Sequence, residues 1–306
     1  MRRTASGLLM CLLLTLLTPR AYAQELALGG QVVGIRLETD GVVVAGLSQV
    51  ETDSGSVCPA RDAGLCPGDR IIALDGRAVQ AASDLIEGVA RAAGRPVELE
   101  ILREEKTLRL QVSPVRSAED QWMMGMWLRD GIAGIGTLTF CDPDTGIYGA
   151  LGHSVNEESS GAPLPIASGS ICRAEVVGVI RGESGAPGEL NGCSDEGQIL
   201  GDIEKNSACG IYGRASGLLG GRAVETGQVR VGPASILSTV SGTEEREFSV
   251  EITRVFQDSA GCHVTLRVTD PALQELTGGI VQGMSGSPIL QDGKLVAAVT
   301  HVSVST

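Results

Sequence analysis

The segment around Ser285 contains residue types that could carry out acyl transfer. Ser285 lies in the sequence Gly283-Met284-Ser285-Gly286, with glycines close on both sides. A serine hydroxyl becomes an effective nucleophile only when a base takes its proton and N–H groups stabilise the oxyanion. Because glycines let the backbone turn sharply, we expect the N–H groups of Gly283 and Ser285 to form such an oxyanion hole. Ser285 is therefore the predicted nucleophile.

The predicted base is His153, which follows an apolar segment that reads as the end of a strand. His153 lies well before Ser285 in the chain. This order of base and nucleophile, like the glycine-flanked serine, resembles chymotrypsin-like peptidases. The other two histidines, His263 and His301, are weaker candidates because both lie in segments that are expected to be strands.

A carboxylate is needed to hold the imidazole of the base in the correct tautomer. Asp270 and Asp202 are both available. In chymotrypsin-like chains the aspartate falls midway between the histidine and the serine, which favours Asp202. A second glycine-rich segment contains Ser184, but it follows His153 too closely to leave room for the strands that normally separate base and nucleophile.

The elements in front of these residues predict a small α+β module. Short β-branched runs alternate with Gly and Asp turns over residues 31–115, and residues 83–93 have the apolar periodicity of a helix. Residues 59–76 resemble the signature of PDZ domains, particularly those fused to exported proteases. That resemblance implies a groove that takes a peptide as an added strand. The candidate loop for the carboxylate of that peptide comprises Val33, Gly34 and Ile35.

The rest of the chain predicts a second unit that is mainly β. Residues 113–117 read as a linker, because a proline ends the last strand and the composition becomes polar. Beyond them, many short Val, Ile and Leu segments with little helical periodicity favour strands in a sandwich or barrel. We therefore expect a PDZ-like domain at residues 24–115 and a chymotrypsin-like double β-barrel peptidase domain at residues 116–306.

The N-terminus has the features of a secretory signal. A charged start is followed by an apolar run over residues 8–17 and by the small-residue sequence Ala21-Tyr22-Ala23. Residues 1–23 are therefore predicted to be a signal peptide or an N-terminal anchor that associates with the membrane. The remaining chain is expected to lie beyond the cytoplasmic membrane.

Composition narrows the class of partner. A formal net charge of −13 argues against nucleic acid, because binding phosphates requires a basic face. With only three histidines and no Cys-x-x-Cys, a metal site is not expected, and acyl transfer needs no cofactor. One of the eight cysteines lies in the signal, so an odd number remains and at least one is free or pairs with another chain. We expect a protein or peptide substrate.

Several long segments together resemble the SpoIVB peptidase family, named after stage IV sporulation protein B. They are residues 122–140, 149–153, 185–190 and 278–302. The family's catalytic serine and histidine match Ser285 and His153. Its acidic residue matches Asp270, so the resemblance favours Asp270 where the fold analogy favoured Asp202.

The resemblance also implies a biological role. Such an enzyme would act in the space between the forespore and mother-cell membranes. It would cleave a membrane-protein partner that restrains an intramembrane protease, would release a late sigma factor, and would also cut itself. Two alternatives are a non-catalytic PDZ-containing signalling or binding protein and a general extracytoplasmic quality-control protease. Specific processing predicts one or a few cuts in one partner, whereas quality control predicts degradation of many unfolded proteins.

Overall fold

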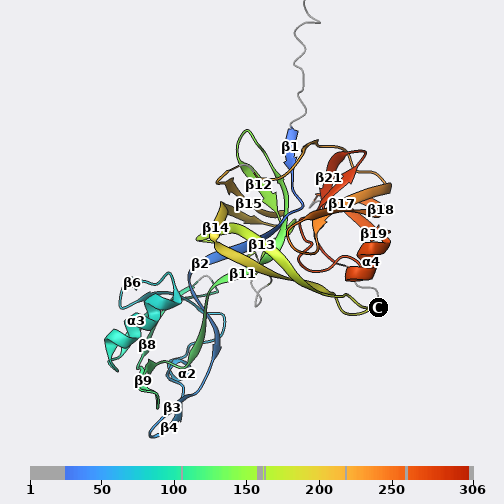
Figure 1. Cartoon of the computed structure of the whole chain (residues 1–306). Helices are drawn as coiled ribbons and strands as arrows, with labels where there is room; N and C mark the ends of the chain where they lie inside the picture. The colour runs from blue at the N-terminus through green and yellow to red at the C-terminus, as the bar shows by residue number, and fades with distance from the viewer. Residues whose placement is uncertain are drawn as a thin grey trace, which may run out of the picture.

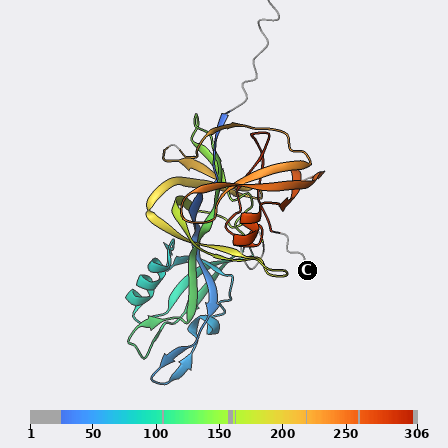
Figure 2. The same cartoon turned by 45° about the vertical axis from the view of Figure 1, so that its right-hand side comes forward.

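The structure is a computed structural model that describes residues 25–104, 106–156, 161, 163–217, 219–258 and 261–302. The described chain is mostly β-strand, which confirms the mainly β class. A small α+β unit lies against two curled sheets (Figures 1 and 2). The predicted signal peptide or anchor, residues 1–23, lies outside the described residues. Every helix in the described ranges is too short or too polar to cross a bilayer.

The first curled sheet closes into a barrel of six antiparallel strands. Around the barrel the order is β11 (Met126–Cys141), β12 (Ile147–Ala150), β15 (Gly210–Ala215), β14 (Glu189–Ser207), β13 (Ser168–Ile180) and β2 (Val32–Leu47), and β2 pairs with β11 again. Two further strands, β1 (Glu25–Leu28) and β16 (Ala223–Glu225), extend the sheet beyond β11. Fully buried side chains fill the barrel, among them Leu37, Leu138, Tyr148, Ile171 and Ile211.

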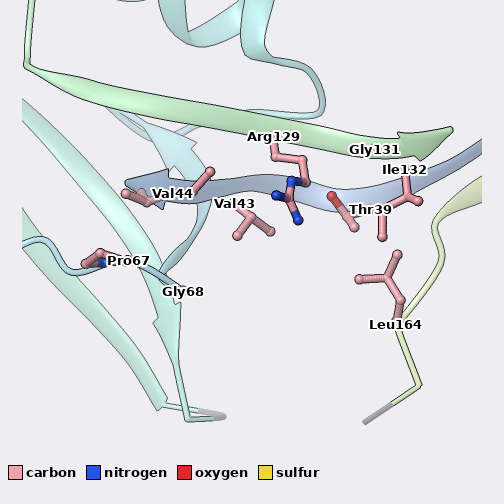
Figure 3. Close-up of a pocket in the computed structure, with 10 residues that line it drawn as sticks. Thr39, Val43, Val44, Pro67, Gly68, Arg129, Gly131, Ile132 and Leu164 are labelled. Atoms are coloured by element: carbon pink, nitrogen blue, oxygen red, sulfur yellow. The ribbon is translucent and has the colours of Figure 1, made fainter. Parts of the chain in front are cut away.

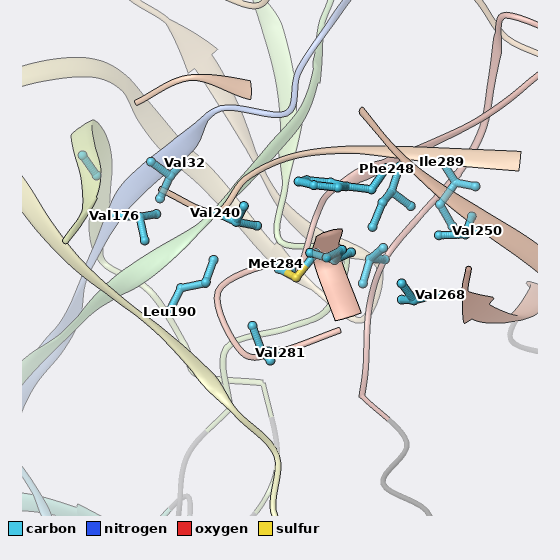
Figure 4. Close-up of a cluster of buried hydrophobic side chains, with 14 of the residues drawn as sticks. Val32, Val176, Leu190, Val240, Phe248, Val250, Val268, Val281, Met284 and Ile289 are labelled. Atoms are coloured by element: carbon cyan, nitrogen blue, oxygen red, sulfur yellow. The ribbon is translucent and has the colours of Figure 1, made fainter. Parts of the chain in front are cut away.

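The second curled sheet has five antiparallel strands. Their order is β19 (Gly261–Val268), β18 (Glu245–Asp258), β17 (Gly232–Thr239), β20 (Pro288–Gln291) and β21 (Lys294–Ala298), and the short helix α4 (Pro271–Thr277) follows β19. Its core also takes in Val32, Val176 and Leu190 from the barrel strands (Figure 4). The expected pair of barrels is therefore realised as one closed barrel and one curled five-stranded sheet that share buried side chains.

The PDZ-like unit contains the expected helix and strands. Its elements are β3 (Val50–Thr52), β4 (Gly55–Val57), α2 (Pro59–Asp62), β5 (Arg70–Leu74), β6 (Arg77–Ala78), α3 (Ala82–Ala92), β7 (Val97–Arg103) and β8 (Lys106–Val112). The signature residue Asp69 is fully buried. Its carboxylate accepts two hydrogen bonds of 2.6 Å from the Arg103 guanidinium and one of 2.8 Å from the Cys66 N–H. The hydrogen bonds to the Asp69 carboxylate raise the pKa of the Arg103 guanidinium above its usual value.

Two long strands run through both units. β2 and β11 pair from Leu47 and Met126, in the PDZ-like unit, to Val32 and Thr137, in the barrel. Residues 25–28 and 32–38 are thus strands of the barrel sheet although they precede the PDZ-like unit in the chain. The expected linker contains β9 (Val115–Arg116), which pairs with β10 (Trp122–Met123).

A cavity of about 250 Å³ lies where the two long strands leave the PDZ-like unit (Figure 3). Thr39 and Val43 of β2, Arg129 of β11 and Leu164 are among its lining residues. The cavity therefore marks the junction between the two units and not the position of any predicted catalytic residue.

All seven cysteines in the described ranges are free thiols. Cys58, Cys141 and Cys172 are buried, and the other four are exposed. Burial raises the pKa of the Cys141 and Cys172 thiols, so these two are less reactive than an exposed cysteine at the same pH.

Candidate active site

Ser285 lies in a tight turn between α4 and β20, where the second sheet meets the barrel. Gly283 and Gly286 in this turn have φ values of +94° and +96°, a conformation that side chains with a Cβ rarely adopt. The turn is held on β11 through Thr137. The Thr137 N–H donates to the Ser285 carbonyl at 2.9 Å, and the Thr137 hydroxyl donates to the Gly283 carbonyl at 3.0 Å.

Gly286 shows how closely the turn approaches the barrel. A Cβ added at Gly286 would lie 2.1 Å from the Thr137 oxygen and 2.5 Å from the Leu151 nitrogen. Leu151 follows β12 and stands two residues before His153 in the chain. The contact that seats the nucleophile turn therefore also places it against the segment that carries the predicted base.

His153 is half-buried, and its ring orientation is defined by one hydrogen bond. Its Nδ1 lies 2.9 Å from the carbonyl oxygen of Ser154. Since a carbonyl can only accept, this contact places the proton on Nδ1 and leaves a lone pair on Nε2. The imidazole thus has the tautomer that a general base requires.

The N–H groups of Gly283 and Ser285 have no acceptor among the described residues, whereas those of Met284 and Gly286 donate to carbonyls at 3.2 and 2.8 Å. The Gln282 carbonyl, which shares a peptide plane with the Gly283 N–H, accepts from the Leu190 N–H at 2.9 Å. The Met284 carbonyl, which shares a plane with the Ser285 N–H, accepts from the Ser287 N–H at 3.0 Å, so both donor planes are fixed. Two preorganised main-chain donors at a serine turn can stabilise a developing oxyanion.

A third chain segment meets the site after β21. The Ser285 hydroxyl donates to the Thr300 carbonyl at 3.2 Å. The ring of the next residue, His301, lies 5.3 Å from the ring of His153 between centroids, with the planes tilted by 36°. Segments from the barrel, the nucleophile turn and the end of the second sheet therefore converge on one place.

Asp270 is not brought to His153. Its side chain caps α4 instead: Oδ1 accepts from the N–H groups of Ala272 at 3.0 Å and Leu273 at 3.1 Å, and Oδ2 accepts from Ser249 at 3.3 Å. The expected carboxylate–imidazole contact is therefore missing from the described part of the chain. The catalytic role predicted for Asp270 from the family resemblance stays a prediction.

The alternative carboxylate, Asp202, is exposed on β14. Its main-chain carbonyl, and not its carboxylate, accepts the Tyr148 hydroxyl at 3.0 Å. The second serine, Ser184, is exposed at the tip of the β13–β14 hairpin, in a turn closed by two hydrogen bonds between Glu183 and Ala186. Neither residue shares the surroundings of Ser285.

The predicted PDZ loop at Val33, Gly34 and Ile35 is wrong. These residues lie in the barrel half of β2, where β11 occupies one edge of the strand and β13 the other. Val33 and Ile35 are buried. With both edges paired, the strand has no free main-chain groups to which a peptide could add.

A different strand edge lies beside the PDZ helix. Residues 126–128 of β11 pair with β2 on one edge, and no other strand of the described chain pairs with them. The Asp130 carboxylate accepts the Ala82 N–H at the start of α3 at 2.8 Å, which joins this stretch of β11 to the helix. The unpaired edge therefore belongs to a segment that sequence reasoning had placed wholly in the peptidase unit.

Sequence reasoning also missed the support of the nucleophile turn by the hairpin. The N–H of Leu190 donates to the Gln282 carbonyl, and the N–H of Gln282 donates to the Gly188 carbonyl, each at 2.9 Å. Residues 185–190 contributed to the family resemblance, but only the fold shows that they form a parallel bridge with the chain just before Ser285.

Two further features surround the site. A cavity of about 300 Å³ lies next to Gly152, between the β12–β15 pair and β21, with Tyr212, Thr226 and Ala297 among its lining residues. In the described ranges, no group of three or more His, Cys, Asp or Glu side chains is placed to hold a metal ion.

Comparison with known proteins finds a matching family for each of the two units. Residues 27–113 match the PDZ domain family. A protein of Clostridium perfringens (strain 13 / Type A) named "Putative zinc metalloprotease" is 34% identical over 68 residues, and the match covers 22% of this chain and 20% of that protein. A crystal structure of the PDZ domain of an SdrC-like protein from Listeria monocytogenes is 25% identical, with a TM-score of 0.25; the match covers 30% of this chain and 90% of that one.

The larger match covers the barrel strands other than β2, the second sheet and the site. Residues 120–306, well over half of the chain, match the family SpoIVB peptidase S55, whose members are serine-type peptidases and hence hydrolases. This range contains Ser285, His153 and the turn with the two unpaired N–H groups. The chain belongs to the SpoIVB peptidase S55 family.

Proposed function

We propose that this protein is an exported serine endopeptidase that cuts a membrane-protein partner during sporulation signalling and also cuts itself. The observation that carries the peptidase part is the turn at Ser285. The N–H groups of Gly283 and of Ser285 itself have no acceptor in the described part of the chain, and the same turn packs against the segment that carries His153. The family match supports the choice of a peptide bond as the reacting group.

The proposed reaction is acyl transfer. Ser285 Oγ leaves the Thr300 carbonyl, gives its proton to Nε2 of His153 and attacks the scissile carbonyl. The N–H groups of Gly283 and Ser285 hold the oxyanion, and His153 then protonates the leaving amine. Water, activated by His153, hydrolyses the acyl-enzyme. Asp270 caps α4, the helix that precedes the turn. The proposal that its carboxylate also orients the His153 imidazole rests on the family resemblance alone.

The PDZ-like unit is proposed to bind part of the same partner. An extended peptide can add to an unpaired strand edge through main-chain hydrogen bonds. Residues 126–128 of β11 offer such an edge close to α3, and the same strand continues to Thr137, which supports Ser285. The family and the expected export together support a protein partner held at the membrane surface, and the net charge of −13 argues against nucleic acid.

The peptidase activity is tested with a serine-directed fluorophosphonate. We expect labelling of the protein, mapped by mass spectrometry to Ser285. Labelling should disappear in Ser285→Ala and in His153→Ala, and persist in Ser184→Ala, the matched control in the similar glycine-rich turn. Labelling at Ser184, or none in well-folded protein, would overturn the proposed site.

The sporulation role needs a separate test. In an endospore-forming host that lacks its own family member, the wild-type gene should restore a reporter that depends on the late sigma factor. The Ser285→Ala gene should not restore it. A protein that labels at Ser285 but fails to restore the reporter would keep the peptidase assignment and refute the sporulation role. Degradation of many unfolded proteins by the same preparation would point to quality control instead.

A further inference from the structure

We propose that His301 is a positioning residue for the peptidase reaction, which holds the imidazole of His153 in the plane needed to take the proton of Ser285. The inference rests on the proposed function, because it assigns His153 as the base. It starts from the juxtaposition of the two rings, whose centroids are 5.3 Å apart.

The need for such a residue comes from the surroundings of His153. Its Nδ1 has a hydrogen bond to the carbonyl of the adjacent residue, Ser154, and no carboxylate of the described chain contacts the ring. One hydrogen bond selects the tautomer but still allows the ring to tilt about the N–H···O direction. A second contact on the face of the His153 ring would prevent this tilting. The ring of His301 makes that contact.

The position of His301 is coupled to that of the nucleophile. The two residues before it contact the turn: the Val299 carbonyl accepts the Gly286 N–H at 2.8 Å, and the Thr300 carbonyl accepts the Ser285 hydroxyl at 3.2 Å. The same segment contacts the chain of the base, because a Cβ at Gly152 would lie 2.7 Å from the Val299 oxygen. A single segment thus touches both partners of the proton transfer and aligns them.

The exposure of His301 makes the idea testable. The side chain of His301 is exposed. The hydrogen bonds that support the turn are made by the main chain of the two preceding residues and do not involve the His301 imidazole. Replacing the ring should therefore leave the fold intact. His263 is a matched control: its ring stacks on Phe256 with centroids 5.0 Å apart, on the β18–β19 pair and outside the site.

The test compares fluorophosphonate labelling rates of His301→Ala, His301→Phe, His263→Ala and the wild type. A loosely held base should slow labelling of His301→Ala by about 10- to 100-fold. His301→Phe retains an aromatic ring against His153 and should label at nearly the wild-type rate, as should His263→Ala. Thermal unfolding of all four proteins should agree.

A spectroscopic measurement separates positioning from a general structural effect. With three histidines in the chain, the ring nitrogens can be assigned by ¹⁵N NMR from single substitutions. Since the Ser154 carbonyl selects the tautomer, His153 should be protonated on Nδ1 in the wild type and both variants. Its ring signals should be sharp in the wild type and His301→Phe, and broadened by ring motion in His301→Ala.

The outcomes distinguish this inference from the function on which it rests. Labelling of His301→Ala at the wild-type rate, or failure of His301→Phe to restore a lost rate, would refute the positioning role while leaving the peptidase intact. Loss of labelling in the wild type itself would refute the proposed function first.

Discussion

At the scale of single residues, the site is built from main-chain hydrogen bonds more than from charge. Ser285 contacts the Thr300 carbonyl, His153 contacts the Ser154 carbonyl, and Thr137 binds the carbonyls of Gly283 and Ser285. Asp270, the carboxylate that the family resemblance selects, uses both oxygens to cap α4 and to bind Ser249. Its helix-capping function can therefore be measured separately from any catalytic one.

Asp270→Ala and Asp270→Asn should differ in stability. Asn is about as good an N-cap as Asp, whereas Ala leaves the first N–H groups of the helix unpaired and costs about 1 kcal/mol. We expect the free energy of unfolding, measured with denaturant, to be the same for the Asn variant and the wild type. For the Ala variant it should be lower by about 1 kcal/mol. Equal stability of both variants would contradict the capping role. Labelling of the stable Asn variant then measures the predicted catalytic role of the charge.

At the scale of elements, the turn that carries Ser285 packs between strands of the two sheets. β11 supports it from the barrel through Thr137, the β13–β14 hairpin supports its start at Gln282, and Val299 after β21 accepts the Gly286 N–H. The glycines in this turn allow main-chain contacts that a Cβ would prevent. The geometry of the site should thus depend on Gly286 as strongly as on the reacting residues.

Gly286→Ala should abolish labelling and destabilise the protein. The new Cβ would overlap the Thr137 oxygen at 2.1 Å, and the positive φ adds about 1–3 kcal/mol of backbone strain. Gly185→Ala is the matched control, because Gly185 has a φ of +83° but no atom within 4 Å of the added Cβ. Fluorophosphonate labelling and denaturant unfolding measure both effects. Normal labelling of Gly286→Ala would contradict the packing described for the turn.

At the scale of the whole molecule, the two units are joined by continuous strands. β2 and β11 pair along their length from the PDZ-like unit into the barrel, and β11 also carries Thr137, which holds the nucleophile turn. The connection between the units is therefore a pair of hydrogen-bonded strands. A disturbance in the PDZ-like core should reach the peptidase part through them.

Asp69→Ala should lower the stability of both units together. It removes the buried partner of the Asp69–Arg103 pair, in which the Arg103 side chain is 34% exposed, and the acceptor of the Cys66 N–H. The loss of these hydrogen bonds to a charged group should cost about 1–3 kcal/mol. The chain has two tryptophans: Trp122 packs against the core of the PDZ-like unit, and Trp127 lies in the part of β11 that belongs to this unit. Tryptophan fluorescence therefore reports on the PDZ-like unit, whereas far-ultraviolet circular dichroism reports on all strands. The two denaturation curves should coincide and shift together.

The control for this experiment is Arg267→Ala, which removes an ion pair between exposed side chains on β18 and β19. Such pairs contribute about 0–1 kcal/mol, so its curves should stay close to the wild type. Separate transitions for fluorescence and circular dichroism in Asp69→Ala would show that the two units unfold independently.

The sequence by itself was enough for the features that depend on local chemistry. Short β-branched runs with glycine turns predicted a mainly β chain, and the periodicity of residues 83–93 predicted α3. The resemblance of residues 59–76 to the PDZ signature predicted a PDZ domain. The resemblance around Ser285 and His153 predicted the peptidase family that the comparison confirms. Turn formation and helix periodicity act over a few residues, which is why these predictions held.

Only the tertiary structure decided which distant segments meet. It placed Val33 to Ile35 inside a barrel with both strand edges occupied, directed Asp270 to the start of α4, and set the ring of His301 against that of His153. Strand alternation is the same whichever neighbour a strand pairs with, and a carboxylate can accept from a helix or from an imidazole. Which strands pair, and which group a carboxylate binds, therefore depends on packing between segments far apart in the chain. The composition or spacing of one segment does not predict it.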